Sequence, residues 1–373
     1  MTILGGSGTS ALPDTAPAAP HFTVLRNLGP NWYATVMGTA ITATGGAALP
    51  YGTAWLPIVC EGIWALSVLM LVTLLLARLG HWVHHRDRAV DHLLDPAVAP
   101  FYGCLPMALL AVGAAGMTVG QRLIGEQAAV DVDWVLWVLG TITGLITAAG
   151  VPYLMIVWHR VPAGNAAPAW LLPVVPPMVS AATGPVLAAY LPAGQPRDTL
   201  VYGCLALFGV SLMATLAILP LVMSRLLYKG SLPLAMTPTL FFVLGPLGQS
   251  VTATGKIADA AGVSLPASAA RAVTYFSVLY GVPVIGFALL WLVLAAAMVI
   301  RAFRRGMPFT MTWWGFTFPL GTCVTGAAAL TAHTHLFAAA WLTVGLYALL
   351  VIGWLAACAG TARGLAKGTL LPA

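Results

Sequence analysis

WWGFTFPLG, residues 313–321, places a bulky ring, Phe318, directly before a proline, Pro319, within a long apolar run. The surrounding stretch, 309–332, is long enough to cross a bilayer, because a membrane-spanning helix takes about 20 apolar residues. Proline has no amide hydrogen and interrupts helical hydrogen bonding. At membrane depth such an interruption is tolerated only where neighbouring helices, hydroxyl groups or water satisfy the freed backbone. The stretch therefore predicts a kinked helix on the inside of a membrane bundle.

The composition predicts that the whole chain is embedded in a lipid bilayer. Of its 373 residues, 60% are hydrophobic and only 7% are charged, and the mean hydropathy is +0.92. Soluble domains carry roughly 25% charged residues, so this chain lacks the side chains for a water-facing surface. The five cysteines form no CxxC pair. They are interpreted as packing residues rather than as a disulfide framework.

We expect an all-α integral membrane fold with ten transmembrane helices. One ten-helix domain occupies 30–360, between a disordered, proline-containing cytoplasmic tail at 1–29 and a cytoplasmic tail at 361–373. The N-terminal tail lacks the basic start and apolar core of a cleaved signal peptide. The expected spans are 30–50, 54–77, 100–121, 134–158, 168–191, 200–224, 234–255, 272–300, 309–332 and 336–359.

The basic residues predict the orientation of the chain in the cytoplasmic membrane. Twelve of the 16 Lys and Arg residues fall at one set of span ends, and four fall at the other. Because cytoplasmic loops carry the excess of Lys and Arg, both termini are expected in the cytoplasm. The basic residues are spread over several loops, so the net charge of +6 does not indicate nucleic-acid binding. The four on the opposite side are Arg122, Arg197, Lys256 and Arg271.

Prolines divide the expected spans into two groups. Proline bends a helix and exposes backbone groups that lipid cannot satisfy. We therefore expect the proline-rich odd-numbered spans to be inner helices and the even-numbered spans to face lipid. Within the odd spans lie Pro106, Pro173, Pro176, Pro177, Pro185, Pro238, Pro246 and Pro319, against Pro152, Pro220 and Pro283 in the even spans.

A recurring spacing predicts that these spans are repeats. A proline or glycine is followed seven residues later by a glycine in four odd spans, and seven residues are about two helical turns. The pairs predict five helical-hairpin repeats with five kinked inner helices around a central pore. The alternative is that Gly, Thr and Pro are simply common in membrane helices. The pairs are Gly38–Gly45, Pro106–Gly113, Pro177–Gly184 and Pro319–Gly326, and Pro246–Gly255 departs slightly from the spacing.

The side chains of the odd spans favour an anion as the transported species. They are hydroxyls and small residues rather than the carboxylate rings typical of cation pores. Hydroxyl and backbone donors replace part of an anion's hydration shell without trapping it. Phe318 shares a helical face with Thr322 and Thr325, so its ring is predicted to plug the pore; the alternative is packing between helices. The predicted lining and kink residues are Gly38, Thr39, Gly45, Pro106, Gly113, Pro177, Thr183, Gly184, Pro246, Gln249, Thr254, Gly255, Pro319, Thr322, Thr325 and Gly326.

Five stretches, one in each odd span, carry a resemblance to a known family. They are Asn31–Thr39, FYGCLPMAL (101–109), WLLPVVPPMVSAATG (170–184), GPLGQS (245–250) and WWGFTFPLG (313–321). In these stretches the chain resembles the tellurite-resistance/dicarboxylate transporter family. That family includes the plant slow anion channels and the fungal malate and sulfite carriers, and the third and fifth stretches are more similar to the carriers.

The resemblance implies ten helices in five hairpins around a pore, a homotrimer, passage of small anions without ATP, and no cofactor. The TFP motif places the family's gating phenylalanine at Phe318. The function expected is passive or proton-coupled transport of malate-like dicarboxylates or sulfite. Alternatives are a gated chloride or nitrate channel and a tellurite-resistance exporter. The long phosphorylated termini of the plant channels have no counterpart in the 29 residues before the first span, so kinase gating of that type is not expected.

Several features admit other interpretations. His81, His84 and His85 with His92 match an HxxHH box, so a membrane di-metal enzyme is a remote alternative. The chain offers too few further histidines on that side, chiefly His21 and His159, and a solvated basic loop is favoured. Glu61 is a candidate proton-coupling carboxylate or a partner for a neighbouring helix. His333 and His335 either sense external pH or form an interfacial turn. A receptor has no need of alternating kinked helices, and a primary pump would need a nucleotide-binding motif that is absent from the sequence.

Overall fold

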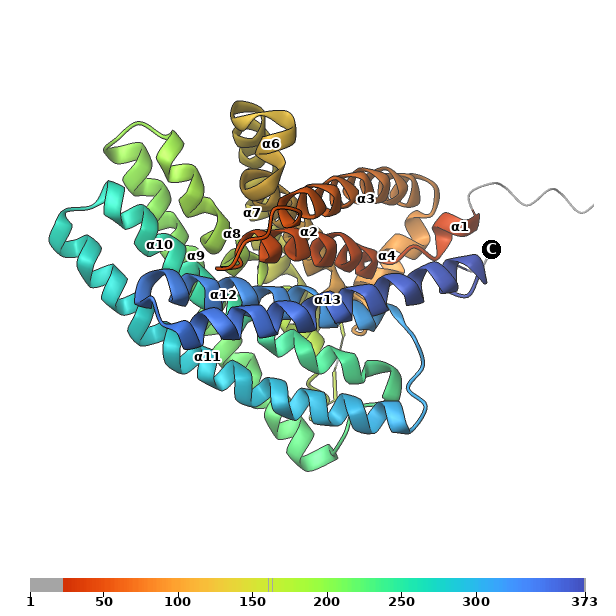
Figure 1. The fold of residues 1–373 in the computed structure, drawn as a ribbon. Coiled ribbons are helices and arrows are strands. Elements are labelled where there is room, and N and C mark those ends of the chain that lie inside the picture. Colours follow the sequence, from red (N-terminus) through yellow and green to blue (C-terminus); the bar gives the residue numbers. More distant parts are fainter. Residues whose placement is uncertain (1–22, 160, 163, 372–373) are drawn as a thin grey trace, which may run out of the picture.

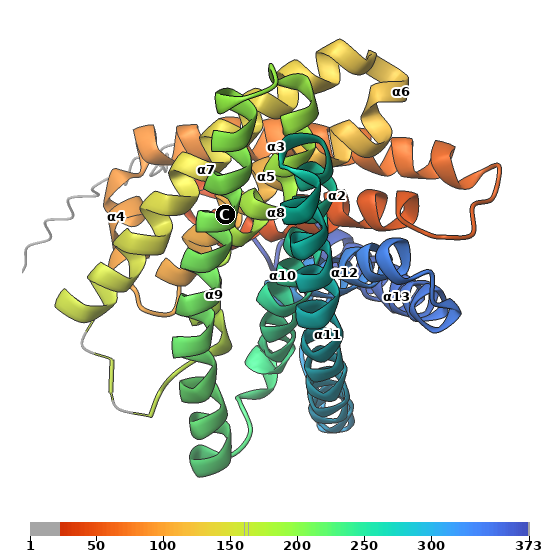
Figure 2. The same cartoon turned by 90° about the vertical axis from the view of Figure 1, so that its left-hand side faces the viewer.

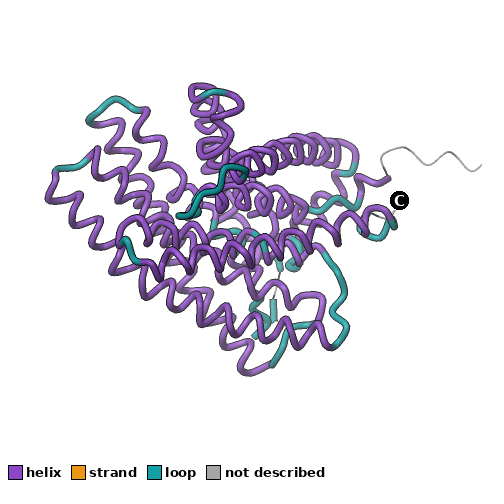
Figure 3. The backbone as a smooth tube through the Cα atoms, viewed as in Figure 1, coloured by secondary structure: helices purple, strands orange, loops and turns teal. Residues whose placement is uncertain are grey.

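The computed structural model describes residues 23–159, 161–162 and 164–371. These residues form helices and connecting turns, and none of them lies in a β-strand (Figure 3). Most of the expected N-terminal tail, residues 1–22, lies outside the described part of the chain, as do the last two residues of the C-terminal one. The first described element is the short helix α1 (Thr23–Arg26). The all-helical fold expected from the composition is confirmed.

Long and short helices alternate along the chain. The short helices are α2 (Tyr33–Ala47), α5 (Cys104–Ala115), α8 (Pro176–Leu187), α10 (Leu244–Ser264) and α12 (Phe318–Thr334). The long helices are α3 (Leu56–His84), α7 (Glu126–Val157), α9 (Gln195–Lys229), α11 (Ala267–Arg304) and α13 (Phe337–Ala366). Two connecting helices, α4 (Arg86–Leu94) and α6 (Gln121–Ile124), complete the set. Each long helix packs against the short helix that precedes it.

The five short helices form a closed ring. Contacts run from α2 to α5, α8, α10 and α12 in turn, and α12 returns to α2. Figure 2 shows these helices grouped at the centre of the bundle, with α7, α9, α11 and α13 spread around them. The ring therefore forms the interior of the molecule, and the long helices form its outer layer.

Burial separates the two layers. Between 17% and 28% of the apolar windows of the five long helices are buried, against 83% for Ala99–Ile124 and 78% for Leu234–Ser264. The exposed faces of the long helices are rich in Leu, Ile, Val and aromatic side chains. Apolar surface is stabilised by about 25 cal/mol per Å² when it is removed from water. Faces of this composition therefore belong in the hydrocarbon of a bilayer.

Seven helical stretches are long and apolar enough to cross a membrane, counted over the described residues. They include the five long helices and the two stretches that contain α5 and α10. The helices α2, α8 and α12 have 15, 12 and 17 residues. Each is shorter than the roughly 20 residues that a span needs, and a 3₁₀ segment lies before each of them: η1 (Pro30–Trp32), η4 (Pro168–Leu171) and η7 (Met311–Phe316).

The structure corrects the expected role of the inner prolines. Pro106, Pro177, Pro246 and Pro319 do not bend the middle of α-helices, because each lies in the first turn of its helix. The first amide hydrogens of a helix have no acceptor within the helix, so a proline in the first turn costs no helical hydrogen bond. In each case the α-helix follows a 3₁₀ segment; before α5 and α10 these are η2 (Ala99–Gly103) and η6 (Leu234–Val243). The prolines thus mark 3₁₀-to-α junctions.

Helices α1 and α13 place the two described ends of the chain at the same end of the bundle. In Figure 1, α1 and the C-terminal end of α13 both lie on the right-hand side. The buried Arg78 of α3 stabilises this end, because its guanidinium donates to the backbone oxygen of Leu28 and, at 3.3 Å, to the hydroxyl of Tyr102. From the sequence alone, Arg78 is interpreted only as a basic residue at the end of a span.

Candidate functional site

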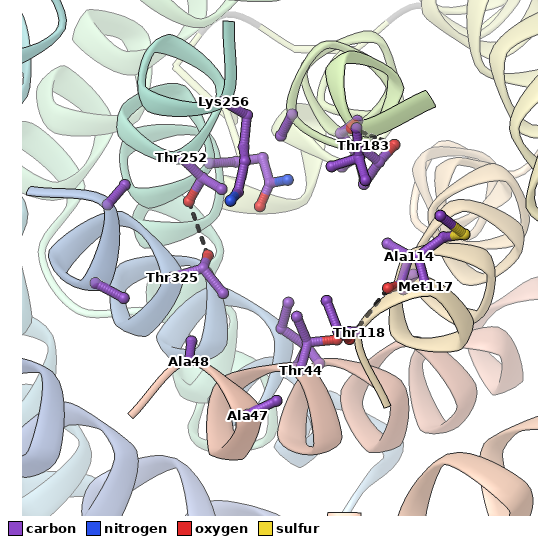
Figure 4. A pocket seen from close by; sticks show the side chains of 18 of the residues that line it. Thr44, Ala47, Ala48, Ala114, Met117, Thr118, Thr183, Thr252, Lys256 and Thr325 are labelled. Carbon is purple, nitrogen blue, oxygen red and sulfur yellow. Dashed lines mark hydrogen bonds between the residues drawn. The ribbon is translucent and has the colours of Figure 1, made fainter. Parts of the chain in front are cut away.

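A cavity of about 400 Å³ lies inside the ring of short helices. All five short helices, or the segments that continue them, contribute to its wall, and α7 adds one residue, Asp133. Figure 4 shows side chains from these helices pointing toward a common open centre. The cavity therefore occupies the position that the sequence predicts for a central path.

Small and hydroxyl side chains form much of the wall. Thr44, Thr118, Thr183, Thr252 and Thr325 line the cavity together with several alanines (Figure 4). The hydroxyls of Thr252 and Thr325 lie 2.7 Å apart and join α10 to α12. Of the predicted lining residues, the structure brings Thr183, Gln249, Phe318 and Thr325 together around this cavity. The wall thus offers hydroxyl and amide groups in otherwise apolar surroundings.

Charged groups also reach the cavity, which corrects the expectation of a neutral path. Lys256 and Asp259 of α10 line it, and their Nζ and Oδ2 atoms lie 3.4 Å apart. His333 of α12 lies beside them, with its Nε2 atom 3.2 Å from Oδ1 of Asp259. His335 has a left-handed backbone (φ 55°) and ends α12. From the sequence alone, Lys256 indicates only the orientation of the chain in the membrane, and no role is predicted for Asp259.

Asp133 is a functional candidate that the sequence analysis missed. Its side chain is 1% exposed, it lines the cavity, and neither carboxylate oxygen has a hydrogen-bond partner among the described residues. It was overlooked because the fourth span was expected to begin at 134, whereas α7 begins at Glu126. A usable signal exists: Asp133 lies seven residues before Gly140 and shares its buried helical face. The seven-residue spacing of that buried face, continued from Gly140 toward the N-terminus, reaches Asp133.

Phe318 separates the large cavity from a small one. The small cavity has a volume of about 10 Å³ and is lined by Met37, Met107, Phe242 and other apolar residues. Phe318 lines both cavities, is 2% exposed, and is the first residue of α12. A single water molecule needs roughly 10–15 Å³ of such space, so the small cavity has no room for an anion. The open space inside the ring of short helices therefore narrows at Phe318.

Other predicted hydroxyls do not line the cavity. Thr322 is fully buried and donates to the backbone oxygen of Pro319 at 2.7 Å. Thr39 donates to the backbone oxygen of Thr35, and Thr254 to that of Val251. Each bond satisfies the hydroxyl within its own helix. Of the two hydroxyls predicted to lie beside the constriction, Thr325 lines the cavity and Thr322 instead stabilises the first turn of α12.

The predicted glycines allow close packing between helices. A Cβ atom added to any of them would approach a neighbour more closely than 3.4 Å, so the absence of a side chain is what brings the elements together. None of them lines the cavity. The nearest neighbours are Thr317 for Gly38, Tyr347 for Gly45, Asp133 for Gly113, Trp137 for Gly184, Ala329 for Gly255 and Gly248 for Gly326.

Glu61 lies away from the central cavity. It lines a separate cavity of about 180 Å³ together with Arg122, whose Nε atom is 3.3 Å from Oε1 of Glu61. The glutamate is 13% exposed and the arginine 61% exposed. Glu61 therefore has a cationic partner on a neighbouring helix and lies outside the central cavity, and its part in proton coupling stays a prediction.

The histidine motif makes structural contacts. Nδ1 of His81 lies 2.8 Å from the backbone oxygen of Leu25, and its ring stacks on His92 at a centroid distance of 5.4 Å. Burial, with Arg78 nearby, lowers the pKa of His92. Nε2 of His159 lies 2.9 Å from the backbone oxygen of Leu93. Across the described residues no three His, Cys, Asp or Glu side chains gather closely enough to hold a metal; His21 lies outside them.

Sequence comparison finds relatives of this chain among membrane transporters. The profile of the voltage-dependent anion channel family matches residues 27–362. A Methanocaldococcus jannaschii protein named as an uncharacterized transporter is 27% identical, over 89% of this chain and 91% of its own length. The sulfite efflux pump of Trichophyton rubrum is 28% identical over 87% and 88%. The malic acid transport protein of Schizosaccharomyces pombe is 24% identical over 50% of this chain and 45% of its own.

Proposed function

Because this chain belongs to the voltage-dependent anion channel family, we propose that it moves small anions through the cavity inside its ring of short helices. The family and the named relatives are channels and transporters, not enzymes. The observation that carries the proposal is the cavity itself, which all five inner helices surround and which ends at Phe318. Movement is passive or coupled to protons, since no nucleotide-binding motif is present in the sequence.

The proposed path crosses a bundle of ten spans. Each inner span consists of a 3₁₀ or irregular segment followed by a short α-helix, and each outer span is one long helix. The five inner-outer pairs are then hairpins, which agrees with the packing of each long helix against the short one before it. Non-helical backbone is tolerated at membrane depth where protein surrounds it, and the buried ring provides that protection.

Phe318 is the proposed gate. Its ring lies between a cavity large enough for an anion and one with room for about one water molecule. Passage requires the ring to leave this position. Its location at the first residue of α12, next to a 3₁₀ segment, supports such a movement, because the backbone on one side of it is not held by the α-helical hydrogen-bond pattern. Pro319 then fixes the direction in which α12 begins.

The wall of the cavity suits an anion that binds weakly. The Gln249 amide is a neutral hydrogen-bond donor, and Lys256 is partly neutralised by Asp259 at 3.4 Å. The threonine hydroxyls donate to backbone oxygens of their own helices and would exchange those bonds to donate to an anion. Neutral donors replace hydration without holding the ion as a free cation would. Sulfite and malate are the proposed substrates because relatives are named for them. Chloride, nitrate and tellurium oxyanions are the alternatives, since the cavity is also large enough for them.

The proposed location is the cytoplasmic membrane, with both termini in the cytoplasm. Twelve of the 16 basic residues fall at the span ends expected on the cytoplasmic side, and the two described chain ends lie together at one end of the bundle (Figure 1). The Lys256 end of the cavity then faces outward. A homotrimer is proposed from the family resemblance, and cross-linking in membranes tests it.

The proposal is tested by flux into liposomes that contain the purified protein. Labelled sulfite or malate should equilibrate faster than in protein-free liposomes. Ala328→Phe adds a ring to the cavity wall and should slow flux, tenfold for each roughly 1.4 kcal/mol that the ring adds to the barrier. Ala356→Phe adds the same ring to the exposed face of α13 and is the matched control. Equal flux in Ala328→Phe and wild type would show that the anion does not cross the cavity.

A further inference from the structure

Asp133 is a buried carboxylate that anion passage, as proposed above, does not require. It is 1% exposed, lines the central cavity, and has no hydrogen-bond partner at either oxygen among the described residues. On its other side it approaches α5, where a Cβ atom added to Gly113 would lie 2.2 Å from Oδ1. The missing side chain of Gly113 leaves the space that the carboxyl group fills. The group therefore lies between the backbone of α5 and the cavity.

These surroundings do not stabilise a negative charge. A carboxylate buried without donors is unfavourable, whereas the protonated acid is much less so. The protonated form also gains an O–H donor, while the ionised form has acceptors only. Since Asp133 lines a cavity proposed to hold anions, ionisation puts a negative charge beside that space and protonation removes it. The carboxylate repels an anion in the cavity, and the neutral acid does not.

The charged groups on the elements around Asp133 have other partners. The helix elements of α5, η3 (Gly116–Gly120) and α8 contain no Asp, Glu, Lys, Arg or His. On α7 itself, Glu126 accepts a hydrogen bond from Tyr190 and Asp131 accepts one from Gln127, each at 2.9 Å. Arg122 of α6 pairs with Glu61.

The remaining charges lie across the cavity or at the far end of α7. Across the cavity, Lys256 and His333 both contact Asp259. At the far end, α7 packs against α4, which carries Arg86, Asp87, Arg88, Asp91 and His92, and against η2, which carries Tyr102. None of these groups is a hydrogen-bond partner of the Asp133 carboxyl group, and the cavity that Asp133 lines is the space beside it from which a proton can come.

We propose that Asp133 is a proton-binding site that controls anion occupancy of the central cavity. One proton from cavity water converts the carboxylate to the acid, and the cavity then accepts an anion. Loss of that proton leaves a negative charge facing the path and expels the anion. Occupancy therefore falls as pH rises through the titration of Asp133. This role rests on the proposed anion path, but it concerns binding in the cavity, which is measurable without transport.

The size of the effect follows from Coulomb's law. A cavity of about 400 Å³ places an anion near its centre at about 8 Å or less from a wall carboxylate. Two unit charges about 8 Å apart at an effective dielectric of about 20 reduce occupancy roughly 30-fold. Because coupling between two ligands is reciprocal, a saturating anion should raise the titration midpoint of Asp133 by about 1.5 pH units, the logarithm of that factor.

Infrared titration of the purified protein tests the proposal directly. Protonated and ionised carboxyl groups absorb at different frequencies, so the spectrum is followed from about pH 5 to about pH 9, where a perturbed carboxyl group titrates. Nitrate is the probe, because it keeps a single charge over this range, unlike sulfite and malate. The expected result is an acid band that is absent in Asp133→Asn and shifts to higher pH with nitrate. Asp131→Asn changes an exposed carboxylate two residues away, so this control should keep the band.

Nitrate flux separates this proposal from the proposed function. Wild type should lose flux as pH rises, and Asp133→Asn should be independent of pH. An absent band, a band unmoved by nitrate, or an Asp133→Asn variant with wild-type pH dependence would each overturn the role of Asp133, while flux itself would still support the anion path. A band that shifts with nitrate in a protein that moves no anion would support Asp133 and overturn the transport proposal instead.

Discussion

Removing the Phe318 ring is expected to open the path. The ring is 2% exposed and is the element that lines both the large and the small cavity. Phe318→Ala merges the two, because the space of the ring joins the roughly 400 Å³ on one side to the space on the other. Anion flux should therefore rise, with its direction still set by the gradient.

The size of the expected increase in flux follows from the packing energy that the Phe318 ring loses when it moves out of its site. Truncating a buried phenylalanine to alanine costs about 3–5 kcal/mol, and a ring that swings out of its site gives up contacts of the same kind. The open state of the wild type is then populated roughly once in 10² to 10³ molecules or less. Because Phe318→Ala needs no such movement, its flux should exceed that of wild type by about 100-fold or more.

Single-channel or liposome flux measurements under an anion gradient check this expectation. Phe316→Ala is the matched control: it removes an equally large buried ring two residues away, one that packs on Phe241 at 4.9 Å and lines neither the large nor the small cavity. Unchanged flux in Phe318→Ala, or an equal rise in Phe316→Ala, would refute the gate. In the first case the ring would be a packing residue, and in the second the bundle would simply be loosened.

Three further variants separate packing, binding and surface effects. Gly248→Ala should lower the free energy of unfolding by about 2 kcal/mol or more in thermal unfolding. The added Cβ would lie 2.4 Å from the backbone of α12, and overpacking costs about 1–3 kcal/mol. Gly262→Ala, with open space around it, should leave the free energy of unfolding unchanged. Thr325→Val removes a cavity hydroxyl and should weaken anion binding about fivefold, whereas Thr331→Val, away from the cavity, should leave binding as in wild type. Glu61→Gln should cost less than about 1 kcal/mol, since its partner is largely exposed, and should not alter the pH dependence of flux; an altered dependence would return Glu61 to the path.

The general architecture is predictable from the sequence because hydrophobicity and proline placement are strong signals. A composition with 7% charged residues leaves only a membrane environment, and the proline-rich segments are those that the structure buries. The length of the inner helices was not predictable in the same way. Hydropathy averages over 3₁₀ and α segments alike, so a window cannot tell that α12 begins only at Phe318.

The site was predicted less well, for two physical reasons. Glycines and threonines on an inner helix face neighbouring helices as readily as they face the cavity. The residue spacing therefore predicts Gly38 and Thr322 as lining residues, whereas Gly38 allows close helix packing and Thr322 forms a hydrogen bond in the first turn of α12. Charged residues near a span end look like loop residues, so Asp133 and Asp259 were passed over although both line the cavity. Which face of a helix meets the cavity depends on tertiary packing, which no single helix pattern contains.

The junction at 317–319 explains why a helix-breaker and a large ring lie together at membrane depth. Thr317 ends a 3₁₀ segment with φ −92° and ψ −77°, and α12 starts one residue later. A proline in that first turn needs no amide acceptor, so Pro319 fixes where the α-helix begins without a lost hydrogen bond. The residue before it is directed by the junction rather than by a helical face. The broken helix thus places the Phe318 ring between the large and the small cavity. In a continuous helix through the same residues, the packing of α12 against α10 and α2 would set the direction of the ring instead.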